Sequence, residues 1–399
     1  MKTQILKSTA HLFREIPRQC KRMVRLGSTI FGNELTTASA NITEPLGKLP
    51  VDEGQATFVV VAGPSFDQTV PTAHVCIQLG YCHAFEKLGI PYIIVDVAHL
   101  EHVLPQLNNP FCSIKGNDYE SMNRGTIQVL KGYPHFVWVD RWFKGIDAFF
   151  SRHNLDPRMF SFSEGLKQKI LESEPSFVYS ATVQMGMTYY EGWQTSGVRV
   201  VSLPLACDTL LYNLSAPYCP EFEGIRLAFV GGYWESKGRQ IDRYLRSFED
   251  DLVIYGYNKW PYKGYRGLLS REAEPSLYRQ SLVCPTINEP TVRLFHGNIN
   301  ERIFKVMGSG GVTVVDAVPA YRELFSEEEL IIPEDEHQFH DVVCTFLNDR
   351  NLAQQYAKKG HEAVVSRHTY MHRAEVILRE LGLDNILSKH RLTAQVQDG

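Results

Sequence analysis

The alternation of buried strands with amphipathic helices constrains the fold of this chain more than any other feature. From about residue 57, β-branched runs such as ATFVVVAG are each followed by a segment with helical periodicity. A continuous β-branched run that ends in glycine is typical of a parallel strand covered on both faces. Strands that alternate with helices therefore predict a parallel, doubly wound α/β sheet.

The pattern occurs twice, which predicts two domains in this 399-residue chain. The first set occupies residues 55–204 and the second residues 225–388, with a proline-containing linker at residues 205–224. The expected strands of the second domain are the runs at 225–232, 251–258, 281–288, 312–316 and 329–334. We expect the last segment, about residues 350–388, to be helical, with a C-terminal helix that packs back on the body, and residues 389–399 to form a tail. Two such sheets place a ligand in the cleft between their carboxyl edges.

Residues 1–54 differ from the rest and are expected to form a basic segment followed by a polar linker. The first 25 residues carry seven lysines and arginines against a single acid, Glu15, with apolar residues interspersed. This pattern resembles a basic amphipathic helix, which would let residues 1–30 lie on an anionic membrane surface. A loose tail, a helix packed on the body and an organellar transit peptide are alternatives that the composition leaves open.

Composition and charge argue against several classes of protein. The formal net charge of −4 argues against a dedicated nucleic-acid binder, which usually needs a basic surplus. We find no apolar run of transmembrane length and no secretory leader, so we expect a cytoplasmic protein, or one at the inner face of a membrane. The eight cysteines show no CxxC pair and no zinc spacing, which favours reduced, buried thiols.

The segment AFVGGYWESKGRQIDRYL has the pattern of a phosphate-binding turn. A buried strand ends at Gly231 and Gly232, and a helix begins near Lys237. Glycines let a ligand approach the backbone closely, and the free N–H groups at a helix N-terminus favour a diphosphate. Lys237 would add a positive charge there. An ordinary strand-to-helix turn with a solvated lysine is the alternative.

A second polar helix start lies within residues 286–325. Asn300, Glu301 and Arg302 stand at the beginning of this helix, after a strand that ends in a polar loop. Such a helix start suits the binding of ribose hydroxyls or phosphate when it faces a cleft. A surface helix capped by an asparagine would use the same residues.

Taken together, residues 226–382 resemble the donor half of the CgeB-like and group-1 glycosyltransferases. The resemblance rests on four segments in the family's order: LPLACDTLLY, FVGGYWESKG, NINERIFKVMGSGGVTVVD and SRHTYMHRAEVIL. Four matches in order carry more weight than any one of them. The resemblance implies a GT-B fold, in which two Rossmann-like domains face each other across a cleft. It also implies transfer of a sugar, hexosyltransferase-like, from a nucleotide diphosphate sugar.

The resemblance also implies roles for individual residues. Lys237 and Arg302 would bind the donor phosphates, and Asn300 would line the same pocket. Two positions depart from the family pattern, because Gly232 replaces an arginine and Lys305 replaces a glutamate that usually holds the ribose.

The departure at Lys305 leaves the ribose contact open. Glu301 or Asp316 would take it over, or the nucleotide would be bound differently. A lysine at this position would alternatively neutralise phosphate.

The acceptor side offers three candidates for the base that deprotonates the acceptor hydroxyl. Asp67 and His74 lie in the loop GPSFDQTVPTAH after the first strand, and Asp140 ends the strand HFVWVD. Strand ends of a parallel sheet face the cleft, and a base there must reach the hydroxyl. His74 as a helix-start residue without a catalytic role is the alternative.

The sequence therefore predicts a metal-independent glycosyltransferase of glycan biosynthesis, with no cofactor beyond the donor substrate. No acidic DxD-like pair stands at a strand end, and the acceptor would be a hydroxyl of a glycan, lipid or protein. A nucleotide-sugar 2-epimerase of the same fold is one alternative, and turnover of donor without acceptor would favour it. A non-catalytic nucleotide-sugar-binding partner in glycan assembly is the other, and binding without turnover would favour that.

Overall fold

The computed structural model describes residues 56–64, 66–67, 72–154, 163–383 and 385–386, all within one compact unit. The predicted basic segment and linker, residues 1–54, and the predicted tail, residues 389–399, lie outside these residues. Predictions about membrane contact therefore stay predictions. We call residues 56–204 the first lobe and residues 225–368 the second lobe.

The first lobe is built on a six-stranded parallel sheet with strand order β2-β1-β3-β4-β5-β6. Its strands are β1 Thr57–Ala62, β2 Tyr92–Asp96, β3 Pro110–Lys115, β4 His135–Trp138, β5 Phe177–Ser180 and β6 Val200–Ser202. The helices between them are α2 Ala73–Lys87, α3 Leu100–Val103, α4 Arg124–Leu130, α5 Ile146–Arg152, α7 Glu164–Glu172 and α8 Glu191–Gln194.

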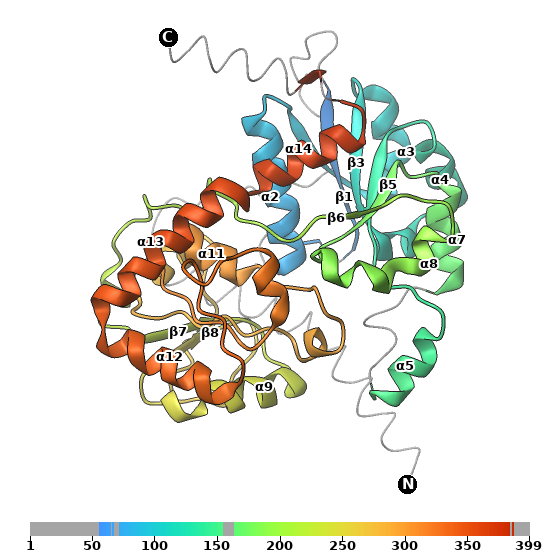
Figure 1. Ribbon diagram of the computed structural model, residues 1–399. Helices are drawn as coiled ribbons and strands as arrows, with labels where there is room; N and C mark the ends of the chain where they lie inside the picture. The colour runs from blue at the N-terminus through green and yellow to red at the C-terminus, as the bar shows by residue number, and fades with distance from the viewer. Residues whose placement is uncertain (1–55, 65, 68–71, 155–162, 384, 387–399) are drawn as a thin grey trace. The chain divides into compact units, whose positions relative to one another are not determined.

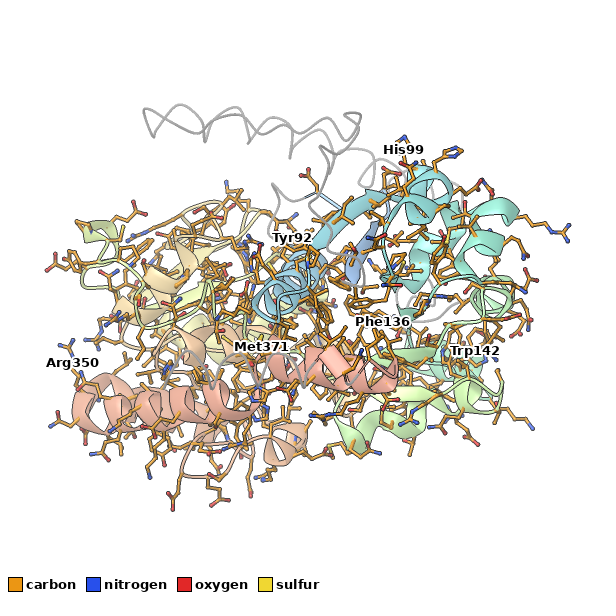
Figure 2. The ribbon with its side chains drawn as sticks, turned by 90° about the horizontal axis from the view of Figure 1, so that it is seen from above. Tyr92, His99, Phe136, Trp142, Arg350 and Met371 are labelled. Atoms are coloured by element: carbon orange, nitrogen blue, oxygen red, sulfur yellow. The ribbon has the colours of Figure 1, made fainter. Side chains whose placement is uncertain are left out.

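Alternate side chains of β1 pack into two hydrophobic cores, one on each face of the sheet. Phe58 and Val60 join one core, whereas Val59 and Val61 join the other. Successive side chains of a strand point to opposite faces, so a fully apolar strand must be covered twice. Figure 2 shows Phe136, which belongs to the first of these cores, in the first lobe. The predicted doubly wound sheet is confirmed here.

The second lobe carries a smaller regular sheet than the sequence predicts. Strands β7 Leu227–Val230 and β8 Leu252–Tyr255 pair in parallel. The expected strands at 281–288 and 312–316 run alongside as extended chain with single bridges, Leu227 to Val283 and Thr286 to Val315. The expected strand at 329–334 is wrong, because these residues form a turn and irregular chain. The helices of this lobe are α9 Glu235–Leu245, α10 Glu274–Gln280, α11 Arg302–Gly308, α12 Glu336–Asn348 and α13 Arg350–Arg367, and α14 Tyr370–Glu380 follows them.

Helix α14 leaves the second lobe and packs beside α2 of the first (Figure 1). Ala374, Ile377 and Leu378 join the core that also contains Phe58. Tyr370 packs so closely on Gly80 of α2 that a Cβ at Gly80 would lie 2.3 Å from the tyrosine ring. The predicted packing of a C-terminal helix against the body is therefore present.

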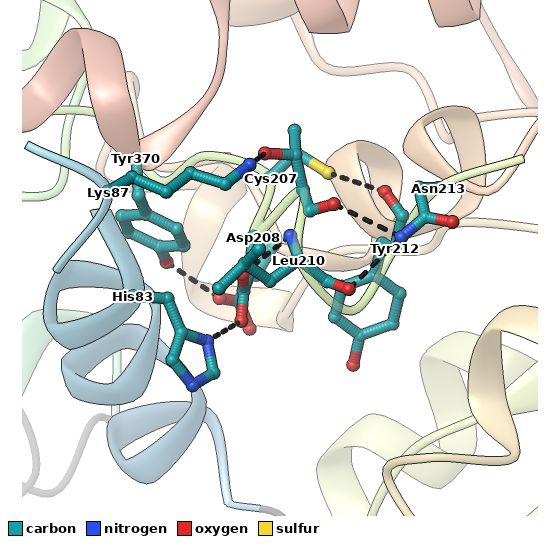
Figure 3. A network of polar contacts seen from close by, with 10 residues as sticks. His83, Lys87, Cys207, Asp208, Leu210, Tyr212, Asn213 and Tyr370 are labelled. Atoms are coloured by element: carbon teal, nitrogen blue, oxygen red, sulfur yellow. Dashed lines mark hydrogen bonds and ion pairs between the residues drawn. The ribbon is translucent and has the colours of Figure 1, made fainter. Parts of the chain in front are cut away.

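The linker between the lobes is tied to α2 by polar contacts, which Figure 3 shows. Asp208 lies 2.7 Å from Nδ1 of His83, and Nζ of Lys87 donates to Oγ1 of Thr209 at 3.4 Å. The backbone N–H of Cys207 donates to the carbonyl of His368 at 2.8 Å. These contacts hold the linker against both lobes, and so they help to set the width of the space between them.

Candidate functional site

A cavity of about 550 Å³ is lined by residues of both lobes. The first lobe contributes the carboxyl ends of β3, β4 and β5, and the second contributes the end of β7 with the starts of α9 and α11. Parallel α/β sheets bind ligands at this edge because the loops and helix N-termini converge there. The cleft therefore lies where the sequence predicted it.

Two cations converge on Gly231, at the end of β7. A Cβ placed on Gly231 would lie 2.8 Å from Nη2 of Arg302 and 3.4 Å from Nζ of Lys237. A side chain at this position would collide with the guanidinium, so the close approach requires glycine. Sequence reasoning named all three residues, and the fold brings them together on the cavity wall.

Arg302 is buried and presents its charge to the cavity. Its Nε donates to the carbonyl of Val230 at 2.6 Å, its Nη1 to that of Ile287 at 3.4 Å, and its guanidinium lies 4.3 Å from the ring centroid of Phe229. Among the described residues, the hydrogen-bond acceptors of its side chain are these backbone carbonyls and no carboxylate. A guanidinium held by neutral partners keeps its positive charge available to an anion.

Lys237 lies in the first turn of α9 and is only 3% exposed. Its Nζ is 3.0 Å from Oε1 of Glu289 and 4.3 Å from the ring centroid of Trp234. Burial lowers the pKa of Lys237, Glu289 opposes that change, and Arg302 adds to it. The ion pair with Glu289 therefore helps to keep a buried lysine charged.

Gly232 has no room for the arginine that the family pattern carries at its position. A Cβ there would lie 2.3 Å from the ring of Tyr257. Arg302 and Lys237 place positive charge within reach of the same turn, so the lost arginine does not leave the turn without cations.

Lys305 lies in a buried cluster of charges instead of facing the cavity as a free cation. Its Nζ is 3.1 Å from Oε2 of Glu301 and 3.7 Å from Oε2 of Glu274. Burial opposes the charge, but the two carboxylates hold the pKa of Lys305 well above its ordinary value. Tyr212 donates to Glu274 at 2.6 Å, and Tyr370 donates to Glu301 at 2.7 Å. All three charged residues line the cavity.

Asp316 lies behind the cavity wall, where it positions Asn288. Its Oδ1 accepts from Nδ2 of Asn288 at 2.7 Å, and Oδ1 of Asn288 accepts from the backbone N–H of Asn300 at 2.8 Å. Oδ1 of Asn300 in turn accepts from the N–H of Arg302 at 2.9 Å. Asn288 and Asn300 line the cavity, whereas Asp316 does not. The carboxylate of Asp316 thus supports the turn before α11 at one remove from the cleft.

Of the three predicted bases, Asp140 alone lines the cavity. Burial raises the pKa of Asp140 to about 6, against the opposing charge of Arg141. Its Oδ1 accepts from the backbone N–H of Arg141 at 2.8 Å. Asp67 is exposed and lies outside the cavity lining.

His74 is buried between aromatic rings at the start of α2. Its ring centroid is 5.5 Å from that of Phe66 and 6.1 Å from that of Trp138. Burial, assisted by Lys115, lowers the pKa of His74 to about 3, so its imidazole is neutral at physiological pH. Its Nε2 is buried and has no hydrogen-bond partner in the described part of the chain. The residue does not line the cavity.

Sequence reasoning missed several residues of the cleft, among them Lys115, Arg141, Glu274, Asn288 and Glu289. Lys115 and Glu289 each stand at the end of an extended apolar run, so the rule that strand ends face the cleft predicts both. Glu274 carries no such signal, because α10 reaches the cleft only through the packing of the second lobe.

A protein family and several solved structures resemble the chain. Residues 223–379 match the family described as glycosyl transferase-like. No curated protein matches the chain. In the described part of the chain, no helix combines the length and the apolar character that a membrane span needs.

The solved structures share the fold at low sequence identity. A T4 phage β-glucosyltransferase mutant in complex with UDP-glucose is 8% identical, with a TM-score of 0.51 over 84% of this chain and 99% of that one. Anabaena HepE in complex with UDP-glucose is 10% identical, with a TM-score of 0.51 over 82% and 99%. An α-glucosyltransferase in complex with UDP and a 13-mer DNA is 11% identical, with a TM-score of 0.52 over 84% and 100%.

These findings agree with the resemblance that the sequence motifs carry. The residues matched by the family, 223–379, nearly coincide with the segment 226–382 that resembles the donor half. Both lobes are covered by the structural matches. The chain thus has the GT-B fold of these glycosyltransferases, and residues 223–379 match the glycosyl transferase-like family.

Proposed function

We propose that this protein is a glycosyltransferase that moves a sugar from a UDP-sugar to an acceptor hydroxyl. The observation that carries the proposal is the convergence of Arg302 and Lys237 on Gly231, just before the N-terminus of α9. Two buried cations beside a backbone without a side chain suit a diphosphate. UDP as the nucleotide is supported by structural neighbours whose complexes contain UDP-glucose or UDP.

We call the second-lobe side of the cavity, which carries Arg302 and Lys237, the donor wall. It would stabilise the leaving group by electrostatics. When the bond between the sugar and the distal phosphate breaks, negative charge grows on the UDP. Arg302, Lys237 and the N-terminus of α9 are already in place to meet that charge, and preorganised groups of this kind are worth about 3–4 kcal/mol each in enzymes. Because these cations supply positive charge at the phosphates, we propose a reaction that needs no metal.

Asp140 is the base that we assign to the acceptor hydroxyl. It lines the cavity, and its raised pKa of about 6 leaves it ionised yet more basic than an ordinary aspartate at neutral pH. His74 and Asp67 are weaker candidates because neither lines the cavity. Trp138 and Tyr190 line the same wall, where rings suit a sugar face. We retain a glycan, a lipid or a protein as the acceptor.

The buried charge cluster supports a donor site that contains a lysine at position 305. Lys305 neutralises two carboxylates that line the second-lobe side of the cavity, so a lysine here is compatible with a donor site. We propose that Glu274 and Glu301 present the carboxylates that meet the ribose. No observation at this cluster favours a non-catalytic binding partner, and none favours a 2-epimerase.

A donor screen by thermal shift tests the proposal. Binding to the native state alone raises the melting temperature, so UDP-glucose should stabilise the protein while GDP-, ADP-, TDP- and CMP-linked sugars should not. Arg302→Ala and Lys237→Ala should abolish the shift. Arg350→Ala, which removes an exposed arginine at the start of α13 (Figure 2), is the matched control and should leave it unchanged. A wild-type protein that none of these donors stabilises would contradict the proposed function.

A further inference from the structure

Glu289 stands out among the carboxylates of the donor wall because half of its hydrogen-bonding capacity is unused. Its Oε1 lies 3.0 Å from Nζ of Lys237. Its Oε2 is buried and has no hydrogen-bond partner in the described part of the chain. Glu274 and Glu301, in contrast, each accept a hydrogen bond from a tyrosine and lie beside Lys305. A buried carboxylate oxygen without a donor is costly, so it needs an account.

The position of Glu289 places this oxygen beside the diphosphate site. Glu289 follows the extended segment 281–288, stands directly before the short turn Pro290–Arg293 without a side-chain capping hydrogen bond, and lines the cavity. Its partner Lys237 is one of the two cations that meet at Gly231. A carboxylate cannot itself face a phosphate favourably, so it must face an uncharged part of the donor.

Of the three uncharged parts of a UDP-sugar, the transferred sugar is the one left for Glu289. The uracil is separated from the diphosphate by the ribose, so it lies farther than the sugar from a cation that binds the distal phosphate. We assign the ribose to Glu274 and Glu301, which flank Lys305, the position that the family pattern assigns to the ribose. The sugar is bonded directly to the distal phosphate, so it lies within a few ångströms of whatever cation binds that phosphate. Glu289 touches such a cation.

We propose that Glu289 binds hydroxyl groups of the transferred sugar and makes the donor site selective for neutral sugars over acidic ones. The proposal rests on the proposed function, because it needs a diphosphate at Gly231. A carboxylate accepts hydrogen bonds strongly from sugar hydroxyls. The same carboxylate repels a uronic acid placed at the same point, and such an unfavourable contact is a common source of specificity.

Because Glu289 is paired with Lys237, the proposal predicts that removing its charge changes the affinities for UDP and for UDP-glucose in opposite directions. Toward UDP alone, Glu289 is a competitor, since its charge repels phosphate and a bound diphosphate itself keeps Lys237 charged. Toward UDP-glucose, it is also a sugar ligand. Removing its charge should therefore help the nucleotide and harm the sugar, whereas a residue with only a structural role would weaken both.

The experiment is isothermal titration calorimetry of the full chain with UDP, UDP-glucose and UDP-glucuronic acid. Wild type should bind UDP-glucose at least about tenfold more tightly than UDP-glucuronic acid. In Glu289→Gln, UDP should bind equally or up to about threefold more tightly, and UDP-glucose about tenfold more weakly. The preference between the two sugars should shrink to below about threefold. Glu327→Gln, the same change at an exposed site of the second lobe, should match wild type throughout.

The other outcomes separate the two proposals. If Glu289→Gln weakens UDP and UDP-glucose alike, or changes neither, the role of Glu289 is wrong while the glycosyltransferase proposal survives. If wild type shows no preference for the neutral sugar, selectivity is wrong. If wild type binds none of the three ligands, the proposed function fails and takes this inference with it. Thermal unfolding of the variant checks that it is folded before any titration is interpreted.

Discussion

The two walls of the cleft differ in how many charged side chains they carry. The second-lobe wall carries Arg302 and two ion-paired groups, since Lys305 is held between Glu274 and Glu301, and Lys237 is paired with Glu289. The charged side chains of the first-lobe wall are Lys115, Asp140 and Arg141.

This difference fits the two substrates that we propose. A nucleotide diphosphate always brings the same charges, so a wall that binds it gains from partners fixed in advance. An acceptor hydroxyl is neutral, and the wall that activates it needs a base of suitable pKa more than it needs fixed cations. We therefore expect changes on the second-lobe wall to alter binding and stability, and changes on the first-lobe wall to alter turnover.

The largest expected effect is on catalysis. Asp140→Asn removes the proposed base and should lower turnover about 10²–10⁴-fold, the range typical of a lost general base. Affinity for UDP-glucose should change little, because Asp140 lies on the opposite wall from Arg302 and Lys237. Steady-state rates with calorimetry of the same samples measure both. If Asp140→Asn instead loses affinity for UDP-glucose, the proposal that the first-lobe wall affects turnover and the second-lobe wall affects donor binding is wrong.

The next largest effect is on stability. Lys305→Met leaves Glu274 and Glu301 as two buried carboxylates without their shared cation, and breaking a buried ion pair in this way costs about 3–5 kcal/mol. Urea unfolding of wild type and variant measures the loss. Lys259→Met, at an exposed lysine of the same lobe, should be close to neutral. A loss below about 1 kcal/mol, the range typical of surface pairs, would mean that the cluster is not held as tightly as its burial indicates.

The pH dependence should be smaller and specific to the first wall. Burial raises the pKa of Asp140 from 3.8 to about 6, so turnover should fall as the pH drops through about 6. The sign for stability is opposite. Between these values the native state binds more protons than the unfolded state, so ionising Asp140 costs stability as the pH rises. Asp140→Asn should therefore gain stability relative to wild type at pH 7 but not at pH 4.

Asp118 provides the control for that pH profile. Burial raises the pKa of Asp118 to about 6 as well, with Lys115 opposing, yet Asp118 does not line the cavity. Asp118→Asn should change the pH dependence of stability while the acid limb of the rate profile persists. If the acid limb of the rate profile disappears in Asp118→Asn and persists in Asp140→Asn, the base is Asp118 and not Asp140.

The smallest expected effect is that of divalent metal ions on the transfer rate, which we expect to be absent. If Arg302 and Lys237 supply the positive charge at the phosphates, as we propose, EDTA should leave the transfer rate unchanged and added Mn²⁺ should alter it less than about twofold. Rate assays in chelated buffer measure this. Loss of activity in EDTA that returns with a divalent cation would show that the donor wall is incomplete without a metal.

Local patterns in the sequence determined the parts of the site that depend on one turn of chain. Gly231, Lys237 and Arg302 were predictable because a strand end, a glycine turn and a helix start each leave a signature within a few residues. The repeated strand and helix pattern likewise predicted two α/β lobes and the cleft between them. Short strands were less predictable, since residues 330–332 are apolar yet form no strand.

Only the tertiary structure decided which polar residues meet and which are hidden. Glu274 reaches Lys305 because α10 packs against α11, and Tyr212 and Tyr370 reach the same cluster from the linker and from α14. The residue type and the loop position of His74 both suited a base. In the structure its ring lies near those of Phe66 and Trp138 and does not line the cavity, whereas Asp140 does. Burial and long-range contacts set pKa values and access, and neither is a property of the local sequence.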